Sequence, residues 1–293
     1  MEKYVNLFTD FGFKKIFGEE PNKDLLIDFL NELLRDQEGL IVDLVYLKNE
    51  HLGSTELDRK AIFDLYCENE KGEKFIVELQ KAKQTFFKDR SVYYSTFPIQ
   101  EQANRGGWNY ELQNVYTISI LDFIFEEDKK DKAKMIYKVK LSDIETNKIF
   151  YDKLTFIYLE MPKFEKTEAE LENHFEKWLY VLRNLHNLKN IPEKLKEKVF
   201  EKLFKLAEIA KMSDQERETY QNSLKYYRDM KNSLDTAFDE GKIEGKIEGK
   251  IEGKQEIALK MLQRGNAISE IVEITDLSEK EIIYLKNRNC QNE

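Results

Sequence analysis

Two acidic side chains on one predicted β-hairpin are the residues of this sequence best suited to chemistry. Residues 61–80 contain two strand-like runs on either side of a short polar loop that ends in Gly72. A three-residue hairpin loop typically ends with a residue in the left-handed region, which glycine adopts without strain. That loop places Asp64 directly opposite Glu78, with Cβ atoms about 4.5–5.5 Å apart on one face of the sheet.

Facing carboxylates repel each other, so this hairpin needs a compensating positive charge. A divalent cation between Asp64 and Glu78 would supply it, and hard oxygen ligands suit Mg²⁺. Gln80 lies on the same face as Glu78. Four apolar side chains are expected to point the other way, into a core: Phe63, Leu65, Val77 and Leu79. The alternative is a solvated hairpin face on which charged residues are simply common, but both runs are too apolar for an edge hairpin.

A basic cluster follows the hairpin directly. Its members are Lys81, Lys83, Lys88 and Arg90. The whole chain has 293 residues and a formal net charge of −9. On such an acidic protein, a local group of cations indicates a surface that faces phosphate.

The sequence lacks the residue patterns that other common kinds of active site require. Cys67 and Cys290 are the only thiols and stand far apart, so neither a disulfide framework nor a zinc cluster is expected. The chain has three histidines, without metal-ligand spacing and in charged, exposed settings: His51, His174 and His186. No phosphate-binding glycine loop of the common nucleotide-binding types occurs. If the chain is an enzyme, its chemistry should come from carboxylates and a metal that they hold.

The composition places the chain among soluble proteins. With 41% hydrophobic and 35% charged residues, it is too apolar for a disordered chain and too charged for a membrane protein. It contains neither an apolar run long enough to span a membrane nor a signal-peptide core. We therefore expect a cytoplasmic protein that does not associate with membranes.

The patterns around the hairpin predict an α/β fold. Apolar residues at spacings of three and four indicate two helices within residues 1–35, separated at Pro21 and Asn22. Alternating and β-branched runs predict five strands: Ile41–Leu47, Ala61–Cys67, Lys74–Gln80, Val115–Phe125 and Leu154–Glu160. Between the third and fourth strands, Phe86–Asn104 suits a crossover helix that stops at Gly106 and Gly107. One mixed sheet between helices is the expected core.

The rest of the chain is predicted to be helical. Two apolar stripes within residues 165–235 indicate helices that pack on the sheet and carry no chemistry. Residues 241–252 then repeat Gly-Lys-Ile-Glu three times, which fits either a weak helix that dimerises over its glycines or a flexible spacer. Three short helices follow, the last opened by a capping box at Ser278 and Glu281. Acidic residues in that last helix favour a partner-binding module over a DNA reader.

These patterns divide the chain into four predicted parts. Residues 1–162 form the core, 163–238 a helical subdomain, 239–256 a repeat linker and 257–293 a small helical tail module.

The ordered set of motifs resembles a known nuclease family. Asp64, Glu78, Leu79 and Gln80 resemble the signature of the PD-(D/E)XK nuclease superfamily, in which an Asp precedes (Asp/Glu)-x-Lys by a hairpin. More narrowly, the chain is similar to the Rpn group of recombination-promoting nucleases and transposases, which carry Gln where Lys is usual. Further matching segments are Thr9–Gly18, Phe29–Asn31, Arg90–Tyr94, Val115–Ile118, Glu216–Tyr220 and the glycine repeat.

The resemblance implies a restriction-endonuclease-like core and Mg²⁺-dependent hydrolysis of DNA, with Mn²⁺ as a substitute. Asp64, Glu78 and the carbonyl group of Leu79 would hold the metal. Gln80 would orient water or phosphate without supplying charge. Asp10 matches an acidic residue that can complete the metal shell. Its alternative roles are an ion pair with Lys14 or a helix N-cap.

A second class of function competes with the endonuclease. A nuclease-fold protein could bind DNA or a partner without efficient cleavage and form homo-oligomers through its C-terminal repeat and tail. The arrangement of Asp64, Glu78 and Gln80 separates the two hypotheses.

Overall fold

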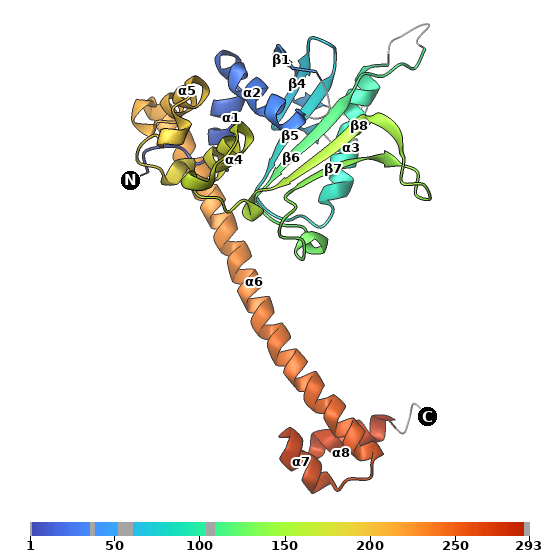
Figure 1. Cartoon of the computed structure of the whole chain (residues 1–293). Helices are drawn as coiled ribbons and strands as arrows, with labels where there is room; N and C mark the ends of the chain where they lie inside the picture. Colours follow the sequence, from blue (N-terminus) through green and yellow to red (C-terminus); the bar gives the residue numbers. More distant parts are fainter. Residues whose placement is uncertain (1, 36–38, 52–60, 104–108, 290–293) are drawn as a thin grey trace. The chain divides into compact units, whose positions relative to one another are not determined.

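The centre of the molecule is a mixed six-stranded sheet (Figure 1). The computed structural model describes all residues except 1, 36–38, 52–60, 104–108 and 290–293. In spatial order the strands are β1 (Leu44–Tyr46), β4 (Leu65–Asn69), β5 (Lys74–Gln80), β6 (Val115–Leu121), β8 (Ile149–Glu160) and β7 (Ile136–Ser142). The β5–β6 and β6–β8 pairs are parallel and the other pairs are antiparallel. Two short strands, β2 (Glu50–His51) and β3 (Ala61–Ile62), pair separately.

Helices cover both faces of this sheet. The α-helices are α1 (Asp10–Phe17), α2 (Lys23–Leu34), α3 (Phe87–Glu101), α4 (His174–Asn184), α5 (Lys198–Leu206), α6 (Asp214–Gln263), α7 (Ile268–Thr275) and α8 (Glu279–Asn289). Short 3₁₀ helices are η1 (Glu20–Asn22), η2 (Glu126–Asp128), η3 (Met161–Lys163), η4 (Glu168–Glu170), η5 (Leu185–Asn187), η6 (Glu193–Leu195) and η7 (Ile209–Lys211).

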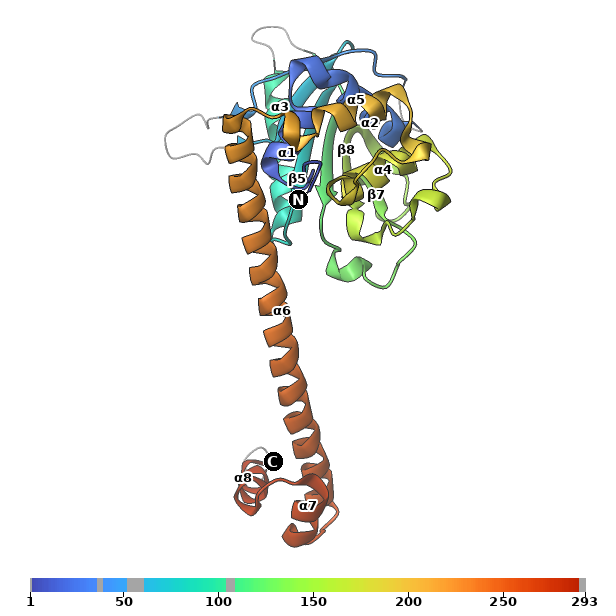
Figure 2. The same ribbon diagram turned by 90° about the vertical axis from the view of Figure 1, so that its left-hand side faces the viewer.

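The two faces have separate apolar cores. Val77 and Leu79 of β5 belong to the large core, which includes buried residues of α1, α2, α4 and α5. Ile76 of β5 belongs to a smaller cluster against which Tyr94 and Phe97 of α3 pack. Figure 2 shows the helices of the large core, α1, α2, α4 and α5, together with α3. Because β5 has a core on each face, it is a central strand and not part of an exposed hairpin.

Most of the predicted elements are present. The strand over Lys74–Gln80 and the two N-terminal helices are confirmed. The helix predicted over Phe86–Asn104 is α3, while its predicted glycine stop lies outside the described residues. The prediction missed β7, an edge strand, although Lys138 and Lys140 alternate there with Val139 and Leu141 in the two-residue period of a strand.

The strand predicted over Ala61–Cys67 is interrupted. It divides into β3 and β4 at Phe63 and Asp64, and the N–H group of Phe63 donates to the carbonyl group of Asn49 (2.9 Å). This break moves Phe63 to the other face. Contrary to the prediction, its ring packs with Tyr66 and Ile76 in the cluster under α3.

Helices α4 and α5, which follow the last strand of the sheet in the sequence, share the large core with the sheet. Contacts divide the chain into two compact units, Met1–Lys231 and Asn232–Glu293. Trp178 of α4 is fully buried among the aromatic rings of Phe17, Phe29 and Phe200. Helices that precede the sheet in the sequence (α1 and α2) and helices that follow it (α4 and α5) therefore complete a single core in the first unit.

An ionic cluster ties α2 to α4. His174 Nε2 lies 2.7 Å from Asp28 Oδ1 and Nδ1 lies 2.7 Å from Glu197 Oε2, so both ring nitrogens face carboxylates. Trp178 Nε1 also donates to Asp28 (2.6 Å). The prediction that the histidines are exposed is wrong for His174 and for His186, which are both partly buried.

This cluster gives a prediction for stability against pH. The hydrogen bond to Asp28 raises the pKa of His174 above its ordinary value of 6.5. Burial raises the pKa of Asp28, but hydrogen bonds from His174 and Trp178 outweigh it and hold that pKa below 3.8. The His174 contribution is complete below pH 6.5 and disappears as the pH rises through the higher folded-state pKa.

We therefore expect the free energy of unfolding to fall with rising pH over that window. The measurement is urea denaturation across the pH range, with His174→Gln as the comparison. The variant should be less stable than the wild type at low pH. Its free energy of unfolding should not show the fall with rising pH that His174 causes. Parallel pH profiles for the two proteins would contradict the assignment.

The glycine repeat is helical. It lies within α6, where a Cβ atom added at Gly241, Gly245 or Gly249 would meet nothing within 4 Å. Ile243, Ile247 and Ile251 are exposed. Each glycine costs a helix about 1 kcal/mol relative to alanine, so this stretch has little intrinsic stability.

The second unit has a small core of its own. Its buried residues are Ala258, Ile271, Leu277, Ile282 and Leu285. The predicted capping box is confirmed, since Ser278 N donates to Glu281 Oε2 (2.7 Å) and Glu281 N donates to Ser278 Oγ (3.4 Å). Gly265, with φ of +81°, follows the C-terminal end of α6.

Candidate active site

The hairpin of β4 and β5 has the predicted register. Leu65 pairs with Val77 and Tyr66 with Ile76, so Asp64 is at the position opposite Glu78. Gly72 occupies the loop with φ of +79°. Asp64 lies in the bend just before β4, which frees its backbone N–H group from the strand ladder.

The two acidic residues are linked by crossed hydrogen bonds. The Asp64 N–H donates to Glu78 Oε1 (3.1 Å), and the Leu79 N–H donates to Asp64 Oδ2 (2.7 Å). Gln80 Nε2 donates to Glu78 Oε2 (3.1 Å). Glu78 is 5% exposed, so these donors hold a buried carboxyl group in place. The three residues that the sequence identified at the hairpin therefore form one connected group.

Burial sets the electrostatics of this pair. It is the largest cause that raises the pKa of both Asp64 and Glu78, and the charge of Asp64 raises the pKa of Glu78 further. The hydrogen bonds and the charges of Lys14, Lys81 and Arg90 act in the opposite direction. The raised pKa values show that burial and mutual repulsion disfavour the doubly ionised pair, and a bound cation would favour that form.

Asp10 is at the first turn of α1, beside this pair. Its charge acts on Asp64 and on Lys81, which places all three in one electrostatic neighbourhood. Asp10 also forms an exposed ion pair with Lys14 (3.0 Å), the alternative that the i,i+4 spacing predicts. The N-cap of α1 is Thr9, whose hydroxyl group accepts from Gly12 N (3.0 Å), so the N-cap role proposed for Asp10 is wrong.

The predicted basic cluster is only partly available to a ligand. Lys83 pairs with Glu126 (3.4 Å), and Lys88 pairs with Glu127, both in η2. Lys81 is partly buried, and desolvation lowers its pKa. Surface ion pairs of the kind made by Lys83 and Lys88 are worth about 0.2–1 kcal/mol, so a phosphate can displace them at small cost.

Helix α3 adds a residue that the sequence reasoning did not assign to the site. Tyr94 packs edge-on against Phe63 (5.1 Å between ring centroids), and Arg90 lies over its ring (5.6 Å). The charge of Glu78 acts on its hydroxyl group. The signal was the i,i+4 spacing of Arg90 and Tyr94, which places both on the helix face toward the hairpin.

The donor set fits a hard divalent cation. Among the described residues, no group of three or more His, Cys, Asp or Glu side chains is arranged to hold a metal. Mg²⁺ does not need such a group, because it is commonly bound by one or two carboxylates and keeps several waters. Asp64 and Glu78 supply the carboxylates, while Leu79 contributes an observed N–H contact to Asp64.

A mixed six-stranded sheet with flanking helices, and with an acidic pair on a central hairpin, is consistent with a restriction-endonuclease-like PD-(D/E)XK fold. The family described as PD-(D/E)XK nuclease family transposase matches residues 7–237, and the chain belongs to this family. No curated protein and no solved structure was found to match the chain.

Membership of this family indicates a nuclease or transposition-related function with DNA as the substrate. Nucleases of this family generally use divalent metal ions. Within the described residues, no helix is both long and apolar enough to cross a membrane.

Proposed function

We propose that this protein is a metal-dependent endonuclease that hydrolyses phosphodiester bonds in DNA, with a role in recombination or transposition. The observation that carries the proposal is the hydrogen-bonded pair of Asp64 and Glu78 on β4–β5. A purely structural role would place two facing acidic residues at a desolvated site, with only hydrogen bonds and the charges of Lys14, Lys81 and Arg90 to offset their repulsion.

Each residue of the pair has a defined task. Asp64 and Glu78 bind Mg²⁺ or Mn²⁺, with the carbonyl group of Leu79 as a further ligand and Asp10 completing the shell. The bound metal would lower the pKa of a water molecule and offset the charge that develops on the phosphate. The crossed hydrogen bonds fix both carboxylates before DNA arrives, so no ordering is needed at the moment of reaction.

Gln80 positions water or phosphate. One N–H of its Nε2 group donates to Glu78, which leaves the second N–H to donate to phosphate and the amide oxygen to accept a hydrogen bond from water. The amide carries no charge and is not a base. Lys81, Lys83, Lys88 and Arg90 supply the positive charge along the DNA backbone.

The proposal is tested by incubating the purified protein with supercoiled plasmid. We expect nicking with Mg²⁺, faster nicking with Mn²⁺ and none with a chelator. The absence of nicking with either metal, in protein that is folded by circular dichroism, would reject the proposal.

A nuclease-fold protein that binds DNA without efficient cleavage is the second candidate. Gln80 in the place of the usual lysine favours it, because the site then has one fewer cation near the phosphate. Such a protein would bind plasmid in the same assay but leave it supercoiled.

We also propose that the repeat of α6 binds a second copy of the chain over its glycines, where an added Cβ atom would meet nothing within 4 Å. The buried residues that α6 contributes to the first unit, including Tyr220, Leu224 and Tyr227, all precede residue 232. Deleting residues 241–293 should therefore leave a soluble protein that retains cleavage but has a smaller oligomeric state by light scattering. Insoluble protein, or an unchanged mass per assembly, would contradict this prediction.

A further inference from the structure

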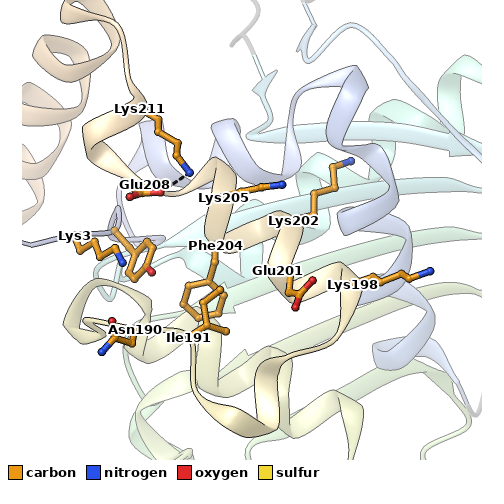
Figure 3. A pocket seen from close by; sticks show the side chains of 11 residues that line it. Lys3, Asn190, Ile191, Lys198, Glu201, Lys202, Phe204, Lys205, Glu208 and Lys211 are labelled. Atoms are coloured by element: carbon orange, nitrogen blue, oxygen red, sulfur yellow. Dashed lines mark ion pairs between the residues drawn. The ribbon is translucent and has the colours of Figure 1, made fainter.

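A basic groove lies along α5, outside the hairpin. It has a volume of about 630 Å³, and five lysines line it: Lys3, Lys198, Lys202, Lys205 and Lys211. Glu201 and Glu208 are the acidic residues of its lining. Figure 3 shows Lys198, Lys202 and Lys205 extending from the same helix, with Phe204 beside them.

The charge of this segment is opposite to that of the chain. Residues 189–211 contain seven lysines and four glutamates, in a protein of net charge −9. Helix α5 buries Phe200, Leu203 and Phe204, so its lysines occupy the outward face. No pattern of apolar packing requires three lysines at spacings of four and three residues.

Backbone hydrogen bonds fix the N-terminal segment that lines the groove opposite α5. Val5 N donates to the carbonyl group of Ala207 (3.0 Å), and Ile209 N donates to that of Lys3 (3.0 Å). Tyr4 packs edge-on against Phe204 (5.0 Å between centroids). These backbone hydrogen bonds and the ring contact fix Lys3 beside the C-terminal end of α5.

Some of these cations are already neutralised and others are not. Lys202 pairs with Asp24 (2.5 Å), and Lys211 pairs with Glu208 (2.6 Å). Within the part of the chain that the structure describes, Lys198 and Lys205 form no ion pair and are exposed. Lys3 is likewise exposed and forms no ion pair among the described residues, so Lys3, Lys198 and Lys205 are the cations most available to an incoming anion.

We propose that this groove binds the phosphate backbone of DNA, as a contact additional to the hairpin. Seven residues of helix separate Lys198 from Lys205, a rise of roughly 10 Å, which corresponds to about three nucleotide steps along one strand. A row of ammonium groups at this spacing recognises charge and strand geometry without reading bases. The inference rests on the proposed function, because DNA is the ligand in both.

The test separates binding from cleavage. DNA binding is measured by fluorescence anisotropy in full-length Asp64→Asn protein, with and without Lys198→Glu and Lys205→Glu, at several salt concentrations. The matched control is Lys130→Glu with Lys132→Glu, two exposed lysines elsewhere in the first unit. Loss of two phosphate contacts should weaken binding about tenfold and reduce the slope of log K against log salt by about 1.8.

The outcomes distinguish the groove from the active site. If the groove variant binds with the same affinity and salt slope as the control, the inference is overturned, whether or not the wild-type protein cleaves DNA. If wild-type protein fails to cleave but the groove variant still weakens binding selectively, the groove stands and the proposed function fails. If the Asp64→Asn protein does not bind DNA at all, both fail.

Folding is checked in the same series. The Lys198→Gln and Lys205→Gln variant removes the charges without reversing them and should show a smaller loss of affinity with an unchanged melting temperature. An affinity equal to that of the control pair in this variant would also overturn the inference.

Discussion

Replacing Asp64 with asparagine is expected to lower the rate of plasmid nicking by about 10³-fold or more. A catalytic metal stabilises charge in the transition state by several kcal/mol, and each 1.36 kcal/mol corresponds to a tenfold change in rate. Glu78→Gln should have a comparable effect, because both carboxylates are proposed metal ligands, each held by a backbone N–H group from across the hairpin.

The same substitution should act differently on stability. Without metal, Asp64→Asn removes one of two facing acidic groups at a desolvated site, so its melting temperature should equal or exceed that of the wild type. Adding Mg²⁺ should stabilise the wild-type protein by mass action, by about 2.7 kcal/mol at a concentration of 100 times Kd. The variant should not respond.

The control for both measurements is Glu70→Gln, on the exposed loop of the same hairpin. It should retain cleavage and the Mg²⁺ response. If Asp64→Asn nicks DNA at the wild-type rate, the hairpin is not the catalytic centre. If the wild-type melting temperature does not change up to millimolar Mg²⁺ and Mn²⁺, no metal binds there.

The second large effect is expected at Gln80. A charge-assisted contact is roughly twice as strong as a neutral hydrogen bond, so the absence of lysine at this position should cost one to a few orders of magnitude in rate. Gln80→Lys should therefore preserve or raise the rate of nicking. Its ammonium group would also lie next to Glu78, where the Gln80 amide now donates.

Gln80→Ala should lower the rate, since it removes both the donor to Glu78 and the oxygen that positions water. Gln100 is an exposed glutamine of α3, and its Lys and Ala variants are the matched controls. Single-turnover kinetics with saturating plasmid provide the measurement. A rate that is the same for glutamine, lysine and alanine at residue 80 would show that this position takes no part in the reaction.

The sequence was sufficient for the hairpin because the determining interactions are local. The loop around Gly72 needs a left-handed residue, and that requirement fixes which residues of β4 and β5 face each other. The register in turn brings Asp64 opposite Glu78. The helices α1 and α2 were likewise predictable, because their apolar faces repeat with the helical period and Pro21 separates them.

Only the tertiary structure decided how the acidic pair is held. The chain leaves the ladder at Asp64 because Phe63 pairs with Asn49, a residue whose proximity no local pattern encodes. That break turns Phe63 toward α3 and frees the Asp64 N–H to bind Glu78. A period-2 pattern assumes an uninterrupted strand, and it therefore assigned Phe63 to the wrong face.

Charge was the property that the sequence predicted least well. Lys83 and Lys88 follow the hairpin in the sequence, but η2 brings Glu126 and Glu127 to them from some 40 residues away. The groove along α5 is the opposite case, because there the fold gathers positive charge that the sequence disperses. Its lysines are dispersed among glutamates in the sequence, and the outward face of one helix together with the paired N-terminal segment gathers them. Local spacing determines backbone register and helix faces, whereas the balance of charge at a surface depends on which distant segments fold against it.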